Sequence, residues 1–356
     1  MRIALILPGS IWMSPYVNIY TTILDSLAVE YDIISWNREG LDRKIEYQYS
    51  ECINSHDSRL KKMLSYYRYT RFIKKILNKG EYDKLIVFGS QLVILLGVFL
   101  IRNCHKRFMV DFRDLSIEQH FILKKWYGIV LKHSCLNVIS SPGFERYLPS
   151  KINYVLSHNF VVKNIDSNAT NVNTCENHID QIKILTIGGI RDFESNKEVL
   201  SSLGNNPKYL LNFVGKGYAT PLLAEYASIH SINNVAFEGY YPKEREDDYI
   251  KGCTMLNIYY PKKKSHLSAL SNRFYHALIH KKGMIVTSNS VQGDYVSKYG
   301  LGIVVDNCND LDCQIQQWLQ CCDPKKFADN CNMLLHRFKS DYEYFCKSVY
   351  VFLGKK

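Results

Sequence analysis

A repeating pattern of short apolar runs between residues 182 and 306 constrains the fold of this chain more than any other feature. Each run has the composition of a β-strand, ends in glycine or polar residues, and is followed by a segment with helix-like spacing. This alternation predicts a doubly wound α/β domain. Because such domains bind ligands at the carboxyl ends of their strands, a ligand site is expected there.

Residues 1–162 show the same alternation of strand-like and helix-like segments. A polar tract follows at residues 163–181, and its lack of large apolar side chains predicts a linker. The 356 residues therefore divide into a first lobe, a linker and a second lobe of residues 182–335, and Phe327–Phe352 has the spacing of a helix. Strands of the first lobe are predicted at Ile3–Leu7, Tyr31–Ser35, Lys84–Phe88, Phe108–Asp111, Asn137–Ser140 and Tyr154–Leu156.

Composition narrows the class of protein without choosing its partner. The net charge of +11 suits nucleic acid, an anionic membrane, a nucleotide-sugar or a lipid diphosphate. None of the 11 cysteines is spaced as CxxC, which predicts reduced cytosolic thiols and no zinc site. The run Ile3–Leu7 is too short for a secretion signal, and Leu92–Ile101 is too short to span a bilayer. We expect a cytoplasmic protein that is at most attached to a membrane face.

The first strand end of the second lobe combines glycine with cations. Gly188 and Gly189 follow the predicted strand Lys183–Ile187, with Arg191 and Lys197 close behind. Glycine lets a backbone approach a ligand closely, and the N-terminus of the next helix offers free N–H groups to an anion. The segment is interpreted either as a phosphate site or as a tight turn followed by solvated charges.

The next two strand ends carry weaker signals. Gly215 and Lys216 belong to a lone Gly-x-Gly, which is either a structural turn or a direct contact to a ligand. Tyr240 and Tyr241 follow a third strand and either stack on a base or pack locally. We expect both loops to lie near the site.

A helix is predicted to begin near Ser271, because Ser271 or Asn272 is a suitable N-cap. Arg273 stands in its first turn, so the helix dipole and this cation would attract an anion together. His276 follows one turn later, and it is either a hydrogen-bonding group of the site or an ordinary surface histidine.

Two strand ends of the first lobe also carry candidate residues. Gly9 ends the first predicted strand, and Asp111-Phe112-Arg113-Asp114 ends a later one. Arg113 beside Asp114 would keep that carboxylate ionised and able to act on a hydroxyl proton. The alternative interpretation of the acidic motif is a salt-bridged helix cap.

The segments beginning at Gly188, Gly215 and Ser271 resemble the donor-binding half of GT-B glycosyltransferases of the retaining family 4 kind. The Asp-Phe-Arg-Asp motif is similar to a signature of bacterial enzymes that build capsular or other surface polysaccharides. The resemblance implies two Rossmann-like lobes with a cleft between them. It also implies a C-terminal helix, about residues 336–356, that returns to the first lobe.

By this resemblance, Arg191, Lys197 and Arg273 would hold the donor diphosphate, and Asp114 would act on the acceptor hydroxyl. Gly9 would face the acceptor or the donor phosphate. The family has two glutamates eight positions apart, and here Ser268 and His276 take their places. His276 would then bind a ribose hydroxyl in place of the second glutamate.

The implied reaction transfers a sugar from a nucleotide-sugar to a polyprenyl-diphosphate-linked glycan. The expected donor is a UDP-sugar. The resemblance implies retention of configuration and neither metal nor cofactor. Two alternatives stay open: a catalytically inactive nucleotide-binding scaffold in a polysaccharide assembly complex, and a nucleotide-sugar epimerase of the same architecture. Whether the chain forms a homo-oligomer also stays open.

Residues 59–79 form the most basic segment of the chain. Eight of these 21 residues are Lys or Arg and none is acidic, while apolar residues recur at helical spacing. The segment predicts an amphipathic helix that lies on an anionic membrane face or an ordinary lobe helix with a solvated basic side. Nothing else in the chain supports nucleic acid as the partner.

Overall fold

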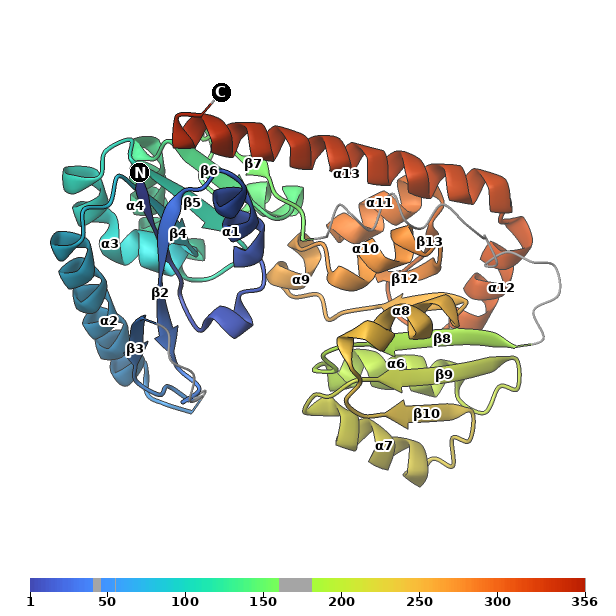
Figure 1. The fold of residues 1–356 in the computed structure, drawn as a ribbon. Helices are drawn as coiled ribbons and strands as arrows, with labels where there is room; N and C mark the ends of the chain where they lie inside the picture. The colour runs from blue at the N-terminus through green and yellow to red at the C-terminus, as the bar shows by residue number, and fades with distance from the viewer. Residues whose placement is uncertain (41–45, 55, 160–180, 356) are drawn as a thin grey trace. The chain divides into compact units, whose positions relative to one another are not determined.

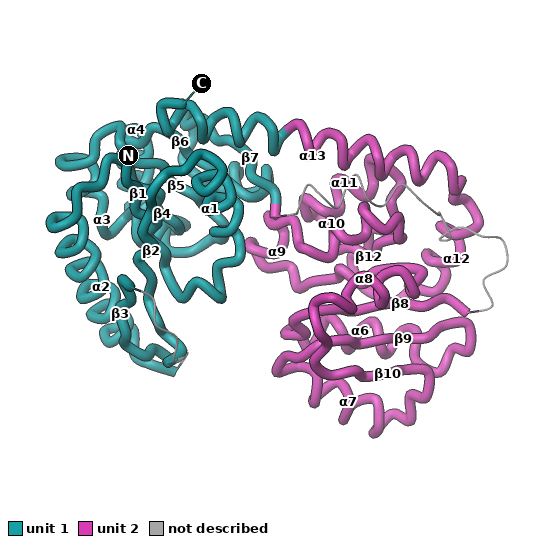
Figure 2. Tube along the Cα trace, viewed as in Figure 1, with its two compact units in different colours: residues 1–158, 341–356 teal, residues 159–340 magenta. Residues whose placement is uncertain are grey.

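The computed structural model describes residues 1–40, 46–54, 56–159 and 181–355 (Figure 1). The chain splits into two compact units (Figure 2). Unit 1 comprises residues 1–158 and 341–356, and unit 2 comprises residues 159–340. The predicted linker at 163–181 lies, apart from Gln181, outside the described residues.

Unit 1 contains a seven-stranded parallel sheet in the order β3-β2-β1-β4-β5-β6-β7. The interior strands β1, β4, β5 and β6 are largely apolar and buried because helices cover both faces of such a sheet. The strands are β1 (Arg2–Ile6), β2 (Glu30–Asn37), β3 (Tyr47–Ser50), β4 (Lys84–Phe88), β5 (Phe108–Phe112), β6 (Leu136–Ile139) and β7 (Val155–Leu156). The helical segments are η1 (Ile11–Met13), α1 (Val17–Ser26), α2 (Arg59–Lys79), α3 (Ser90–Asn103), η2 (Ile117–Gln119), α4 (Phe121–His133) and η3 (Pro142–Arg146).

Unit 2 repeats this architecture with a six-stranded parallel sheet in the order β10-β9-β8-β11-β12-β13. Its strands are β8 (Ile182–Ile187), β9 (Tyr209–Val214), β10 (Val235–Glu238), β11 (Met255–Ile258), β12 (Gly283–Thr287) and β13 (Gly302–Val305). Its helical segments are α6 (Phe193–Leu203), α7 (Ala219–Ile229), η4 (Lys243–Arg245), α8 (Glu246–Lys251), α9 (Lys264–Ser268), α10 (Asn272–Ile279), α11 (Val291–Tyr299) and α12 (Leu311–Cys321). The predicted pair of Rossmann-like α/β lobes is confirmed.

In both sheets the strand order reverses beside the first strand of the unit. The reversal falls between β1 and β4 in unit 1 and between β8 and β11 in unit 2. Connections on either side of such a point leave in opposite directions, so a crevice opens at the carboxyl ends of these strands. Each unit therefore has one position where its topology favours a ligand.

The C-terminal helix α13 (Pro324–Leu353) supplies side chains to the cores of both units. Phe327 and Phe338 are buried in a core cluster of unit 2. Phe345 and Phe352 are buried in the core of unit 1, where Phe345 packs edge-on against Tyr20 at 5.5 Å. The helix returns to the first unit as the sequence predicted.

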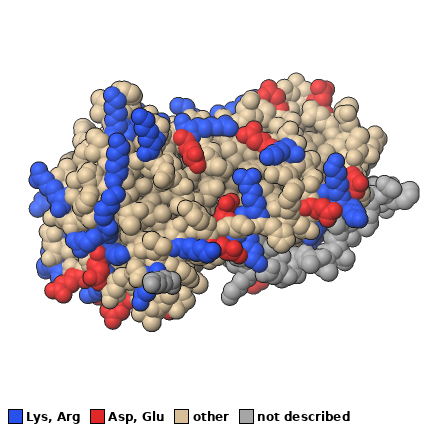
Figure 3. All heavy atoms as spheres, turned by 90° about the horizontal axis from the view of Figure 1, so that it is seen from above, with Lys and Arg blue, Asp and Glu red and all other residues tan. Residues whose placement is uncertain are grey.

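Three findings bear on the sequence predictions: the state of the cysteines, the character of the helices and the distribution of surface charge. Every cysteine in the described part of the chain is a free thiol. Within the same described residues, none of the helices has the length and apolar character needed to cross a bilayer. On the face drawn in Figure 3, lysine and arginine are interspersed with acidic and uncharged residues rather than gathered into one basic surface.

Candidate functional site

A pocket of about 380 Å³ lies in unit 2 at the carboxyl ends of β8 and β11. This is the point where the strand order of the sheet reverses. The pocket brings together six residues predicted from the sequence: Gly188, Gly189, Arg191, Asn272, Arg273 and His276. The same pocket is also lined by Asp192, Glu246, Tyr260, His266 and Gln292, which the sequence analysis did not select.

Glycine shapes the β8 side of the pocket. Gly188 has a φ of +94°, a left-handed conformation that residues with a Cβ rarely adopt. Gly215 follows the neighbouring strand, and a Cβ on it would lie 2.1 Å from the carbonyl oxygen of Gly188. The Gly-x-Gly loop therefore lets two strand ends approach each other, which favours its interpretation as a structural turn.

Arg273 is the central cation of the pocket. It is only 8% exposed, and its Nε donates to the carbonyl of Ile187 at 2.6 Å. Its Nη1 donates to the carbonyl of Asn257 at 3.1 Å, and its guanidinium lies 5.5 Å from the centre of the Tyr260 ring. These acceptors are uncharged, so they fix the guanidinium at the ends of β8 and β11 without neutralising it.

Helix α10 directs its N-terminus at the same pocket. Ser271 is the N-cap, as predicted, and its hydroxyl accepts from the backbone N–H of Phe274 at 3.4 Å. The hydroxyl of Ser271 also donates to Oε1 of Gln292 at 2.7 Å, which ties the cap to α11. The free N–H groups of the first turn and the dipole of the helix add to the positive potential supplied by Arg273.

The carboxylate of Glu246 also lines the pocket, beside His276, where the sequence predicted only the histidine. The Oε2 of Glu246 lies 3.1 Å from Nε2 of His276, and Oε1 accepts from the hydroxyl of Tyr241 at 2.8 Å. Burial alone would raise the pKa of Glu246, but hydrogen bonds from His276, Lys243 and Tyr241 outweigh it and lower the pKa to about 2. The pocket thus combines an ionised acceptor with its cations, a combination that suits a ligand bearing both hydroxyl and phosphate groups.

The remaining predicted residues of unit 2 lie outside the pocket lining. Lys197 is 3.5 Å from Glu194 and 5.7 Å from the centres of the Phe193 and Tyr226 rings. Tyr240 is 78% exposed. Tyr241 acts on the site through its hydrogen bond to Glu246, and Lys216 belongs to the glycine turn.

In unit 1 the Asp-Phe-Arg-Asp motif forms a buried ion pair. Arg113 donates from Nε and Nη2 to the two oxygens of Asp111, each at 2.6 Å, and Tyr20 donates its hydroxyl to the same carboxylate. Arg113 also donates to the carbonyl of Ser157 at 2.9 Å. Burial acts to lower the pKa of Arg113, but the Asp111 carboxylate outweighs it and the pKa is raised. The sequence had assigned Arg113 to Asp114, but its bidentate partner is Asp111.

Asp114 and Gly9 occupy the carboxyl ends of β5 and β1. Asp114 is exposed, and its Oδ1 accepts from the backbone N–H of Leu115 at 2.8 Å. The carbonyl of Gly9 accepts from the backbone N–H of Trp36, and a Cβ on Gly9 would meet no heavy atom within 4 Å. Both residues lie at the edge of the sheet where a parallel α/β domain binds ligands, and their proposed roles stay predictions.

Among known proteins, the chain is similar in fold to solved structures. No protein-family model matches the sequence, and no curated protein matches it either. Among solved structures, sucrose-phosphate synthase from Thermosynechococcus elongatus aligns with a TM-score of 0.71 at 12% identity over 99% of each chain. The lipopolysaccharide outer core galactosyltransferase WaaB aligns with a TM-score of 0.68 at 13% identity, again over 99% of each chain.

A third similar structure contains a nucleotide. Anabaena HepE in complex with UDP aligns with a TM-score of 0.60 at 10% identity, over 98% of this chain and 99% of that one. The fold of this chain is therefore the GT-B fold of glycosyltransferases.

Proposed function

We propose that this chain is a glycosyltransferase that binds a UDP-sugar in the unit 2 pocket and transfers the sugar to an acceptor. The observation that carries the proposal is Arg273, which lines the pocket while its hydrogen bonds go to uncharged carbonyls. Arg191 and the N-terminus of α10 line the same space. The GT-B fold supports the reaction class, and the UDP complex of the similar HepE structure supports the nucleotide.

In this proposal the pocket acts by charge and position. Negative charge grows on the diphosphate as the sugar leaves, and preorganised cations and helix N–H groups stabilise that charge. The pair formed by Glu246 and His276 accepts and donates hydrogen bonds, so it suits the ribose or sugar hydroxyls. Glu246 would thereby supply a carboxylate where the family has a glutamate at the position of His276.

The mechanism, the acceptor and the location are inferred from the sequence resemblance. We infer retaining, family 4-like transfer that needs no metal, with a polyprenyl-diphosphate-linked glycan as acceptor in surface polysaccharide synthesis. Asp114, exposed after β5, is the group proposed to orient the acceptor hydroxyl. The proposed location is the cytoplasmic face of the membrane, where such an acceptor is presented.

The first half of α2 supports contact with a membrane. Leu60, Met63, Leu64 and Tyr67 are between 50% and 68% exposed, and they recur with the spacing of one helical face. Further along α2, Ile73 is buried in unit 1. The apolar residues of α2 are therefore exposed in the first half of the helix and packed in the core further along. The exposed ones lie among basic residues, as expected of a helix that binds an anionic surface.

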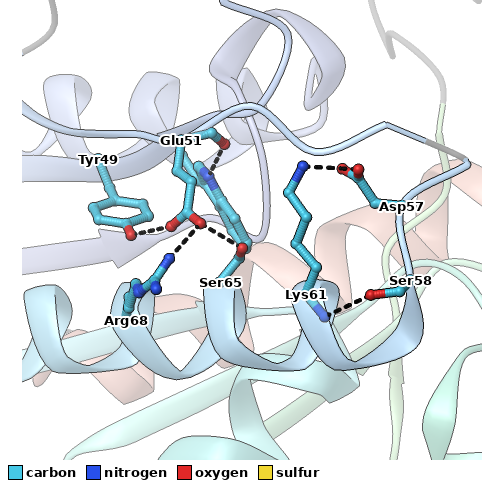
Figure 4. Close-up of polar contacts among 8 residues, drawn as sticks. Tyr49, Glu51, Asp57, Ser58, Lys61, Ser65 and Arg68 are labelled. Atoms are coloured by element: carbon cyan, nitrogen blue, oxygen red, sulfur yellow. Dashed lines mark hydrogen bonds and ion pairs between the residues drawn. The ribbon is translucent and has the colours of Figure 1, made fainter.

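Acidic residues already neutralise some of these cations. Figure 4 shows Lys61 paired with Asp57 at 2.7 Å and Arg68 paired with Glu51 at 2.9 Å. Arg71 and Lys75 have no ion-pair partner among the described residues. Membrane contact is therefore proposed to use Arg71 and Lys75 more than Lys61 and Arg68.

A binding screen followed by a transfer assay tests the proposal. The purified protein is titrated by calorimetry and thermal shift with UDP, GDP, CMP and their sugar conjugates, with EDTA and without it. Selective binding of UDP or a UDP-sugar in EDTA, with sugar transfer to a polyprenyl diphosphate acceptor, is the expected result. Binding without transfer to any acceptor would favour the scaffold, and no binding by any nucleotide would overturn the proposed pocket.

A further inference from the structure

A cluster of nitrogen and oxygen ligands lies at the edge of the pocket, on α8 and α10. His276 on α10 and His280, the C-cap of that helix, are four residues apart and so share one face, with their rings 6.2 Å apart and 13° from parallel. Asp247 on α8 places its Oδ1 3.1 Å from Nε2 of His280. One ring nitrogen of each histidine and one oxygen of Asp247 all lie within 4.8 Å of one another.

The two helices that carry these groups share a hydrophobic core, which fixes their backbones. Ile250 of α8 belongs to the same buried cluster as Phe274, Ala277 and Leu278 of α10. A tetrahedral ion with bonds of about 2.1 Å needs ligand atoms about 3.4 Å apart. The side chain of Asp247 is 46% exposed, so it can rotate to close the remaining distance.

His276 has the further contacts that metal-binding histidines usually have. Its Nε2 lies 3.1 Å from Glu246, while its Nδ1 is buried and has no hydrogen-bond partner among the residues that the structure describes. A ligating histidine commonly binds the ion through one ring nitrogen and holds a carboxylate with the other. Nδ1 of His276 is therefore the ring nitrogen left to bind an ion, while Nε2 holds Glu246.

We propose that His276, His280 and Asp247 form a binding site for a zinc-class divalent cation. Two imidazoles and one carboxylate are donors that suit Zn²⁺ and its neighbours, whereas Mg²⁺ and Ca²⁺ prefer oxygen alone. Three protein ligands leave the fourth position to water or to a group in the adjacent pocket. The cation ties α8 to α10 and shares His276 with the nucleotide pocket.

This site departs from the sequence expectation that the chain holds no metal. The spacing of His276 and His280 was visible in the sequence, but the third ligand comes from another helix. The acidic run Glu246–Asp248 gives no sign of which carboxylate faces the histidines. The proposal does not depend on the glycosyltransferase activity, because cation binding is measured without nucleotide or acceptor.

The test uses Co²⁺ as a spectroscopic probe of the full-length protein, followed by displacement with Zn²⁺. Co²⁺ is expected to give the visible bands of a four-coordinate nitrogen and oxygen site, and Zn²⁺ to abolish them. Asp247→Asn and His280→Gln are each expected to weaken Zn²⁺ binding at least about tenfold. His336→Gln, which changes an exposed histidine on α13, and Mg²⁺ in place of Zn²⁺ are the controls.

Two results would overturn the site. One is equal Zn²⁺ affinity in the wild type and in Asp247→Asn. Because the side chain of Asp247 is half-exposed, this substitution leaves the core between the helices intact. The other is a Co²⁺ spectrum dominated by thiolate charge transfer and unchanged by either substitution, because exposed cysteines such as Cys313 would then be the ligands. Circular dichroism of each variant establishes that a lost signal is not lost folding.

Discussion

The two units each place an arginine at the carboxyl edge of a parallel sheet, but they use its charge in opposite ways. Arg113 of unit 1 makes a bidentate ion pair with the fully buried carboxylate of Asp111. Arg273 of unit 2 is also buried, yet its hydrogen bonds go to the carbonyls of Ile187 and Asn257. Its charge therefore acts on the pocket that it lines.

On this difference we propose that Arg113 is a structural cation and Arg273 a ligand-binding one. A paired arginine adds little field beyond its partner, whereas an arginine held by neutral dipoles keeps its attraction for an anion. The sequence alone does not distinguish their roles, because Arg113 follows a strand and Arg273 begins a helix, and both positions suit a ligand site. The proposed diphosphate site therefore depends on the partner of the guanidinium rather than on the residue type.

The largest effect is expected at the ion pair of unit 1. Arg113→Ala leaves Asp111 buried without its cation, which costs about 3–5 kcal/mol of the free energy of unfolding. Urea denaturation measures the loss, with the exposed residue change Arg102→Ala as control. A loss below about 1 kcal/mol would mean that the pair is not structural, and the contrast between the two arginines would fail.

The next effect is expected at Arg273. Arg273→Ala removes an unneutralised charge from the pocket, so kcat for sugar transfer should fall about 10²–10³-fold. Steady-state kinetics measure the loss, and circular dichroism checks that the variant folds. Arg337→Gln, an exposed change on α13, serves as the control. If transfer proceeds at the wild-type rate, Arg273 does not belong to the site.

A smaller effect is expected on α2, where ion-paired and unpaired cations should contribute differently to binding of anionic vesicles. Replacing Arg71 and Lys75 with Gln should weaken binding to anionic vesicles by about 1 kcal/mol per residue. Replacing the ion-paired Lys61 and Arg68 should weaken it less. Vesicle sedimentation at fixed salt measures both double variants. Equal binding by the wild type and both variants would rule out contact through this helix.

The smallest effect is a pH dependence at Glu51. Hydrogen bonds from Ser65 and Tyr49, followed by the charge of Arg68, lower its pKa (Figure 4). Because the folded pKa lies below the unfolded one, ionised Glu51 stabilises the protein at neutral pH, and this contribution is lost as the pH falls below about 4.5.

The free energy of unfolding should accordingly fall less in Glu51→Gln than in the wild type when the pH is lowered from 6 to 3.5. The difference between the two proteins is expected to be under about 1 kcal/mol. Urea denaturation at both pH values measures the difference, with the exposed residue change Glu81→Gln as control. A variant with the pH profile of the wild type would show that these hydrogen bonds do not favour the charged form.

The sequence predicted those elements whose pattern is set locally. The basic helix at 59–79 and the strand Lys84–Phe88 have their predicted bounds, since apolar spacing and capping residues determine them. The edge strand Tyr47–Ser50 escaped prediction because it is polar and only partly buried, unlike the apolar runs of the sheet interior. Edge strands lack the buried pattern on which such predictions depend.

The site was predictable only in part, because some of its members are fixed by tertiary contacts. Gly188, Arg191 and Arg273 follow strands or begin a helix, and topology brings such positions together. Glu246 stands in an acidic run that resembles a solvated surface, and only the packing of α8 on α10 turns it toward His276. The pairing of Arg113 with Asp111 is local instead, because the two residues are only two positions apart at the end of β5.

A crystal structure of the protein with UDP is the most direct test of the central claim, which is that the charge of Arg273 marks the diphosphate site. The account predicts phosphate oxygens within hydrogen-bond distance of the Arg273 or Arg191 guanidinium and of the first N–H groups of α10, with the ribose near Glu246 and His276. UDP bound at the strand ends of unit 1, or bound in unit 2 without contact to either arginine, would contradict it.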